Sequence, residues 1–272
     1  MRLYKLELLK LTGRRFTQTM TGLLLAVLVL QLWVESGLAG AWKAENDFGQ
    51  FIGYVRFIDL LQYFVLYGMV WLTVVLTPFY CEDRQSKTDV LIMTSVQGKL
   101  SDFAARLAVT LTLAVASFIL ALGAAYWCCY ILYGYPDGNA SAREIYFWID
   151  ETTSALLDGS IYTFIRYYLI LVLCAVLMLI GIIVWVSAVS SKTVHSLIAV
   201  SGIFWFPVML ESGLNPRGIS FLLVTGQPIY LVIVRYLYED WSLYGQHIFL
   251  ALLVAAVGSL CGGRRWCLSR RQ

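Results

Sequence analysis

Residue types that often carry catalysis are present in this sequence, but they do not have the spacings that catalytic motifs require. Gly98 and Lys99 form its one Gly-Lys pair. Met93 stands where the first glycine of a phosphate-binding loop should be, and Leu100 replaces the hydroxyl residue that would reach magnesium. The sequence also contains no Gly-x-Ser-x-Gly turn and no His-Glu-x-x-His pair. We therefore expect no catalytic residue and no cofactor-binding site in this chain.

Metal and redox chemistry have equally little support. His195 and His247 are far apart in the sequence, and none of the six cysteines forms a Cys-x-x-Cys pair. Cys128 and Cys129 are adjacent, but adjacent cysteines rarely form a disulfide. Burial as small apolar side chains is the preferred interpretation of that pair. We expect no metal site.

Composition predicts an all-α membrane protein that crosses the bilayer several times. Hydrophobic residues make up 60% of the chain and charged residues 14%, whereas a soluble domain carries about 25% charged residues. Several apolar runs reach the roughly 20 residues that cross a hydrocarbon core. A barrel would need alternating segments, and runs such as 23–30 do not alternate.

We predict a single transmembrane domain, residues 1–272, with six transmembrane helices. The predicted spans are 16–35, 56–79, 103–133, 162–190, 194–210 and 244–261. An interfacial helix over residues 1–15 precedes them, since Tyr4, Leu8 and Leu11 fall on one helical face. The polar face is formed by Glu7, Lys10 and Arg14. A frayed basic tail is the alternative for this segment.

Charge asymmetry predicts the orientation. With six spans, most of the 20 basic residues lie on the side that holds both chain ends, and most of the 17 acidic residues lie on the other. The positive-inside rule then places both termini in the cytoplasm. A seventh span would put the C-terminal arginines outside. We therefore predict that the segment 217–238, which Gly226-Gln227-Pro228 interrupts, is an extracellular pair of re-entrant half-helices.

Two further features belong to the predicted outer side. Ser141 and Glu144 form a capping box, which predicts an amphipathic helix over 141–158. The third span ends in a cluster suited to the headgroup boundary, formed by Tyr126, Trp127, Tyr130 and Tyr133.

Polar residues within the spans are candidates to face a substrate pathway, since polar groups in lipid seek the interior of a bundle. Glu35 and Asp59 lie near the outer boundary, where a hydrated helix end is the favoured interpretation. The candidate pathway residues are Gln31, Asp59, Gln62, Tyr63 and Tyr67.

The segment 80–102 is the longest charged interval between two apolar segments on the predicted cytoplasmic side. It carries charges of both signs. Ser86 to Asp89 reads as a capping box before the apolar run 90–93, and Gly98 is a plausible helix stop. We predict a short interfacial helix here on which another protein docks.

The layout, and above all the run EDRQSKTDVLIMTSVQGK from Glu82 to Lys99, resembles the permease subunit of a type-2 exporter-class ABC transporter, a family found largely in bacteria. In that family an acidic residue precedes Thr or Gly-Thr, and an aliphatic run and a basic residue follow. This chain lacks the glycine before Thr88 and the proline after the aliphatic run, which is typical of a divergent member.

The resemblance implies that the chain forms half of a dimeric translocation pathway in the bacterial plasma membrane. Its partners would be a second permease copy or a paralogue, the lipid bilayer, and a separate ATPase dimer that holds ATP and magnesium; nucleic acid is not expected. The cargo would be an exported amphipathic or lipophilic compound such as a peptide, an antibiotic or a lipid. The residues implied in ATPase docking are Glu82, Asp83, Arg84, Lys87, Thr88, Asp89 and Lys99.

Two other classes stay open. A non-transporting membrane scaffold or sensor would have the same composition but no ATPase partner. An ion-coupled carrier would need paired ionisable residues near the middle of the bilayer. The last four predicted spans offer no such pair.

Overall fold

The computed structural model describes residues 2–44, 51–85, 96–144, 159–190, 192–213 and 244–268. Within these ranges regular structure is helical and no strand occurs, which confirms the all-α prediction. The helices are α1 (Arg2–Thr12), α2 (Arg15–Ala44), α3 (Ile52–Gln85), α5 (Val96–Leu132), the short 3₁₀ helix η2 (Ala142–Glu144), α6 (Ile161–Val189), α7 (Thr193–Gly213) and α11 (Tyr244–Leu268).

Five of these helices are long and apolar enough to cross a membrane. The apolar stretches are Arg15–Gly40, Ile52–Cys81, Leu100–Leu132, Ile161–Val189 and Tyr244–Cys267. Long helices are the expected form in lipid, because they satisfy every backbone polar group internally. The remaining predicted span, 194–210, coincides with α7, whose side chains are described only as far as Ile203. The five long helices give the architecture of a multi-pass membrane protein, and six spans remain a prediction.

Several predicted boundaries differ from the helices. The helix α3 continues through Pro78 to Gln85, and α5 begins at Val96, so both helices extend into the predicted loop 80–102. The stop expected at Gly98 is wrong, because α5 passes through that residue. The capping box at Ser86 and the re-entrant segment 217–238 lie outside the described residues, as do residues 145–158 of the predicted amphipathic helix.

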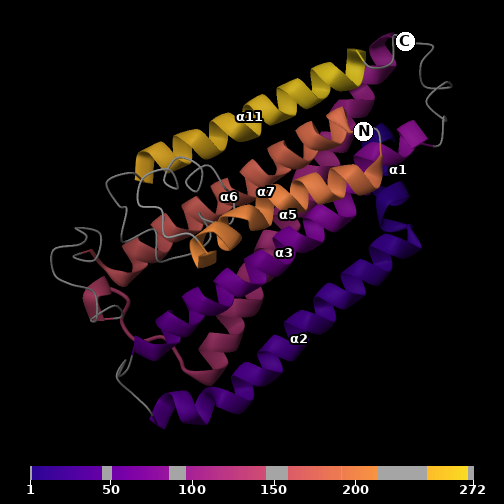
Figure 1. Ribbon diagram of the computed structural model, residues 1–272. Coiled ribbons are helices and arrows are strands. Elements are labelled where there is room, and N and C mark those ends of the chain that lie inside the picture. Colours follow the sequence, from indigo (N-terminus) through magenta and orange to yellow (C-terminus); the bar gives the residue numbers. More distant parts are fainter. Residues whose placement is uncertain are drawn as a thin grey trace.

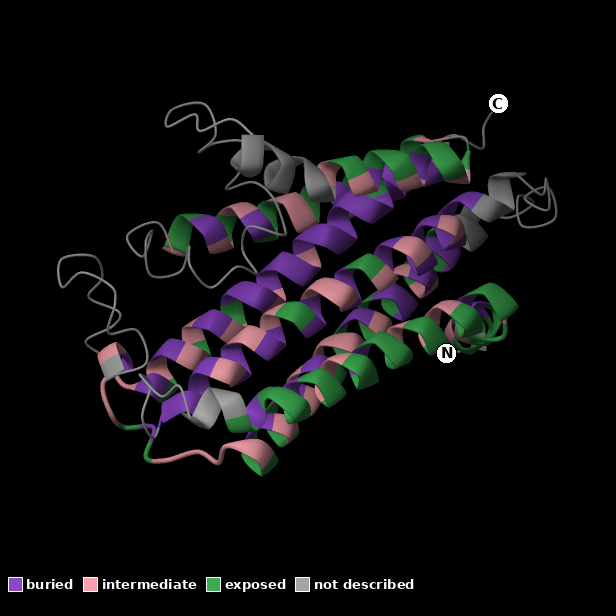
Figure 2. Cartoon of the chain, turned by 60° about the horizontal axis from the view of Figure 1, so that its bottom comes forward, coloured by how far each residue is buried: buried purple, intermediate pink, exposed green. Residues whose placement is uncertain are grey.

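The helices form an elongated bundle in which α2 lies along one edge and α11 along the opposite edge (Figure 1). The helix α6 contacts α11, α3 and α7, and α3 contacts α5. Buried positions gather along the middle of the bundle, while exposed positions predominate on the outer helices (Figure 2). Most of the apolar stretch of α6 is buried, whereas little of α2 is.

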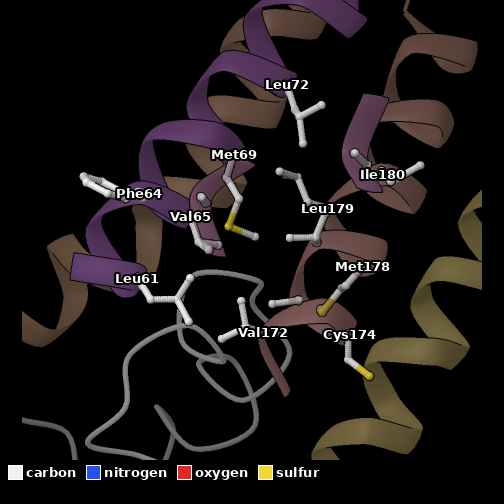
Figure 3. Close-up of a cluster of buried hydrophobic side chains, with 14 of the residues drawn as sticks. Leu61, Phe64, Val65, Met69, Leu72, Val172, Cys174, Met178, Leu179 and Ile180 are labelled. Atoms are coloured by element: carbon white, nitrogen blue, oxygen red, sulfur yellow. The ribbon is translucent and has the colours of Figure 1, made fainter. Parts of the chain in front are cut away.

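Buried apolar side chains of α3 and α6 form a large part of the core, and Val65, Met69 and Leu179 lie between these two helices (Figure 3). Its members include Leu61, Phe64, Val65, Met69 and Leu72 of α3 and Val172, Met178, Leu179 and Ile180 of α6. Lipid tails are as apolar as these side chains, so close packing rather than escape from water has to stabilise this contact. Small residues that let helices approach closely should therefore be decisive.

The pair α6 and α11 is packed through such residues. Gly258 and Gly262 are four positions apart on α11 and face Gly181 and Val184 of α6. A methyl group on Gly181 would lie 2.6 Å from the Cα of Ala255, and one on Gly262 would lie 2.7 Å from Cγ1 of Val184. A methyl on Gly258 would collide with the backbone carbonyl of Gly181. This is the small-xxx-small contact typical of membrane helices.

The first prediction concerns this glycine contact. Gly258→Ala should destabilise the protein by about 1–3 kcal/mol, the usual range for overpacking, although alanine is intrinsically the better helix former. The free energy of unfolding in mixed micelles measures the effect. The control is Gly22→Ala on exposed α2, where an added methyl meets nothing within 4 Å and stability should hold or rise. Equal effects of the two variants would contradict the close approach of α6 and α11.

Candidate functional site

The residues implied in ATPase docking lie at and between two helix ends. Glu82, Asp83 and Arg84 belong to the last turn of α3, and Lys99 belongs to the first turn of α5. Lys87, Thr88 and Asp89 lie outside the described residues, and side chains are described only up to Cys81 and again from Leu100. These two helix ends flank the predicted docking segment.

The helix α1 packs beside the start of α5. Its buried and exposed residues differ in one respect from the faces that the sequence predicts. Leu11 is buried, and the Tyr4 hydroxyl donates to Thr112 Oγ1 of α5 over 3.1 Å. Glu7, predicted on the polar face, is buried as well, while Leu6 and Leu9 are exposed. The reason is a buried cation on α5 that a sequence pattern within α1 does not show.

That cation is Arg106, which is completely buried. Its Nη1 donates to the backbone oxygen of Phe79 over 2.9 Å, and its Nε lies 3.3 Å from Asp102 Oδ2 and 3.6 Å from Glu7 Oε2. The guanidinium carbon lies 5.2 Å from the ring centroid of Phe79 and 5.0 Å from that of Trp266. A single side chain therefore joins α1, α3, α5 and the end of α11.

We call Glu7, Lys10, Asp102 and Arg106 the Arg106 cluster. Lys10 belongs to it electrostatically, since burial and, to a smaller extent, the Arg106 guanidinium lower the pKa of its ammonium. The two carboxylates are the acidic partners of Arg106, and the positive charges of Lys10 and Arg14 also act there. Burial of an arginine requires such acidic partners, because an isolated buried charge is severely destabilising.

A second charge cluster lies at the opposite ends of the same helices. Arg56 of α3 donates twice to the Glu35 carboxylate of α2, over 2.8 Å from Nε and 2.6 Å from Nη2. The hydroxyl of Tyr133, just beyond α5, donates to the same carboxylate over 2.7 Å. Arg56 Nη1 also donates to Asp59 over 3.2 Å. This Glu35 cluster ties α2, α3 and the end of α5 together.

The hydrated helix end expected at Glu35 is therefore wrong. Glu35 is only 1% exposed, and its charge is stabilised by Arg56 and Tyr133. Burial and the bond to Glu35 raise the pKa of Tyr133, which keeps its hydroxyl protonated as a donor. The Asp59 side chain is 38% exposed, which agrees with its expected position near the outer boundary of the membrane.

A cavity of about 470 Å³ lies toward the same end of α3 and α5 as the Glu35 cluster. It is bounded by α3, α5, α6 and the chain that follows α5. Its lining consists of Tyr54, Phe57, Ile119, Leu122, Gly123, Tyr126, Tyr135, Tyr162, Ile165 and Leu169. Five of these residues are aromatic, and we call this space the aromatic cavity. Its volume falls in the range of small-molecule sites, roughly 300–1,000 Å³.

A tight turn after α5 builds one wall of the aromatic cavity. Gly134 has φ +75, a conformation that favours glycine, and its N–H donates to the carbonyls of Cys129 and Tyr130. The turn brings Tyr135 against Tyr126, with ring centroids 5.2 Å apart. Gly53 at the start of α3 packs so closely on Gly134 that any side chain there would collide with its carbonyl.

The candidate pathway residues do not line this cavity. Asp59 belongs to the Glu35 cluster, Tyr63 is exposed on α3, and Gln31, Gln62 and Tyr67 are partly buried elsewhere. The cluster predicted at the headgroup boundary comes nearer, since Tyr126 lines the cavity. The partners Tyr54 and Tyr162 come from other helices, so no spacing within one segment could have identified them.

A second cavity, of about 400 Å³, lies between α6, α7 and α11 and has an entirely apolar lining. Trp185, Ile203 and Cys261 are among its lining residues. One of its walls is α7, whose side chains beyond Ile203 are not described.

Known protein families, curated proteins and solved structures contain no match to this chain. The features that can inform function are therefore the two charge clusters, the aromatic cavity between the helices, and the helix ends beside the docking segment.

Removal of Arg106 should be strongly destabilising, because two buried carboxylates lose their principal partner. We expect Arg106→Met to lower the free energy of unfolding by about 3–5 kcal/mol. The triple variant Arg106→Met, Glu7→Gln, Asp102→Asn should recover much of that loss. Arg166→Met, at an exposed position of α6, is the matched control and should have little effect. If the triple variant were no more stable than the single one, charge pairing would not be what holds Arg106.

In the Glu35 cluster, replacement of Glu35 should lower the free energy of unfolding more than replacement of Asp59. Glu35→Gln should cost about 3 kcal/mol, because it leaves the half-buried Arg56 without its bidentate partner. Asp59→Asn should cost under about 1 kcal/mol, since that pair is partly exposed. Both changes keep side-chain size, so unfolding in mixed micelles compares charge alone. A larger loss for Asp59→Asn would contradict the assignment of Glu35 as the main partner of Arg56.

Proposed function

We propose that this chain is the membrane-spanning subunit of an ATP-driven ABC exporter, a divergent member of the type-2 exporter class. It forms half of a dimeric pathway with a second copy or a paralogue, in the plasma membrane of a bacterium. A separate ATPase dimer supplies the energy from the cytoplasm. The cargo is an amphipathic or lipophilic compound.

The observation that carries the proposal is the position of the Arg106 cluster. Arg106 lies within three turns of the start of α5, and its backbone partner Phe79 lies within two turns of the end of α3. The cluster also holds α1 and the end of α11. A force on the segment between α3 and α5 would therefore move four helices together, as a coupling element must.

Two further observations support it. Both terminal helices meet at the Arg106 end, where the charge asymmetry predicts the cytoplasm. The opposite end holds the aromatic cavity, whose lining suits an amphipathic ligand better than a polar one.

The test is to purify the tagged protein from membranes of its source organism and measure magnesium-dependent ATP hydrolysis. We expect hydrolysis to accompany the protein and to fall at least tenfold when Glu82→Gln, Arg84→Gln and Asp89→Asn are combined. The matched control is Arg264→Gln with Arg265→Gln, an exposed basic pair at the end of α11, which should retain hydrolysis. Absence of hydrolysis from the normal protein, or undiminished hydrolysis in the triple variant, would reject the proposal.

An ion-coupled carrier is the second candidate, and the Glu35 cluster is the observation that favours it. Three ionisable residues meet there within apolar helices. Uptake or export by vesicles without ATP, driven by an imposed proton gradient and lost in Glu35→Gln, would favour the carrier. Transport that needs ATP would favour the exporter.

A further inference from the structure

We propose that the aromatic cavity binds the quaternary ammonium group of an amphiphile, with the hydrocarbon chain lying along its aliphatic wall. Export of this ligand rests on the proposed function, whereas its binding depends only on the aromatic cavity. The ligand class is a trimethylammonium group on an alkyl or acyl chain.

One end of the cavity is a box of aromatic rings. The centroid of Tyr135 lies 5.0 Å from that of Tyr54 and 6.2 Å from that of Phe57, and Tyr162 meets Tyr54 edge-on at 6.3 Å. Several rings around one space can surround a cation with their negative faces, and quaternary ammonium recognition depends on this arrangement. The rings come from α3, α6 and the turn after α5, so the bundle itself fixes the box.

Two of the three phenol groups of the box donate their hydrogen bonds to backbone carbonyls rather than to a ligand. The Tyr54 hydroxyl donates to the carbonyl of Pro136 over 2.7 Å, and the Tyr135 hydroxyl donates to the carbonyl of Tyr126 over 3.2 Å. What these two residues offer the cavity is ring surface. A ligand that needs hydrogen-bond donors, such as a phosphate or a carboxylate, finds few here, whereas a quaternary ammonium group needs none.

The surrounding charges also favour a cation. Among the residues that the structure describes, no lysine or arginine lines the aromatic cavity. Toward the same end of α3, Arg56 is paired with both Glu35 and Asp59, which gives that cluster a formal excess of one negative charge. Asp137, directly after the turn, interacts electrostatically with Tyr54. Charges of this sign strengthen binding of a cation in a space of low polarity.

The remaining lining is aliphatic. Leu122 and Ile119 of α5 face Ile165 and Leu169 of α6, within the apolar stretches of both helices. Exposure of Ile119 and Tyr162 indicates that the cavity opens at the surface of the bundle. A chain attached to the ammonium group can therefore leave toward lipid. Either a choline lipid of the bilayer or a free cationic amphiphile supplies this chemistry.

The test uses the full-length protein in lipid nanodiscs made of phosphatidylethanolamine and phosphatidylglycerol, with radiolabelled decyltrimethylammonium as probe. Binding is measured at equilibrium and corrected with empty discs. We expect saturable binding at one site, about tenfold tighter than that of the uncharged analogue with a tert-butyl end, which is the discrimination a desolvated cation–π site can give. No saturable binding, or equal affinity for the uncharged analogue, would overturn the ammonium site.

Variants locate the site. Gly123→Leu fills the cavity from a position where an added methyl meets nothing within 4 Å, so the fold should persist while affinity falls at least tenfold. Gly22→Leu on α2 is the matched control and should bind normally. Tyr135→Phe keeps the ring and should retain affinity, whereas Tyr135→Leu should lose it. Normal binding by a folded Gly123→Leu protein would overturn the location.

The two sources are separated by adding phosphatidylcholine to the discs. Competition with the probe identifies the lipid headgroup as the occupant, and undiminished binding identifies a free amphiphile; both outcomes support the ammonium site. None of these measurements involves an ATPase, so the ATP-hydrolysis assay described above tests the exporter function separately. If co-purified hydrolysis were absent and the probe still bound, the exporter function would be overturned and the cavity assignment would stand.

Discussion

The buried guanidinium of Arg106 is the constraint on which the rest of this bundle depends. A charged group without water must have partners of opposite charge and acceptors for its N–H groups. Glu7, Asp102 and the Phe79 carbonyl meet that need from three different helices. Because α1 supplies one of these partners, an amphipathic segment becomes an integral part of the bundle. The Glu35 cluster applies the same rule at the other end of α3 and α5.

Between the two clusters, stability depends on how closely helices approach. The glycines of α6 and α11 permit backbone contact that any larger residue would prevent. Near the start of α6, residues of α3, α5, α6 and the chain after α5 line the aromatic cavity. The helix α6 therefore takes part both in a close glycine contact and in the wall of a cavity.

The sequence predicts most of the helices and few of the contacts. Apolar run length identifies the five spanning helices, because crossing a bilayer imposes a minimum length that local composition reveals. The buried roles of Glu7 and Glu35 were not predicted, because their partners Arg106 and Arg56 lie on other helices. Gly98 was expected to end a helix, but propensity is a weak prior and α5 passes through it. Of the residues that line the aromatic cavity, the sequence singled out only Tyr126. The others could not be predicted, because the cavity forms where four separate segments pack together.

In the orientation we propose, the Arg106 cluster lies at the cytoplasmic surface and the aromatic cavity lies toward the exterior. Cysteine labelling in intact cells with a membrane-impermeant maleimide tests this most directly. A cysteine in place of exposed Asn139, beside the turn that follows α5, should be labelled from outside. A cysteine in place of exposed Thr12, at the end of α1, should react only after the membrane is permeabilised. The reverse pattern would contradict the orientation and, with it, the coupling of a cytoplasmic ATPase to this chain.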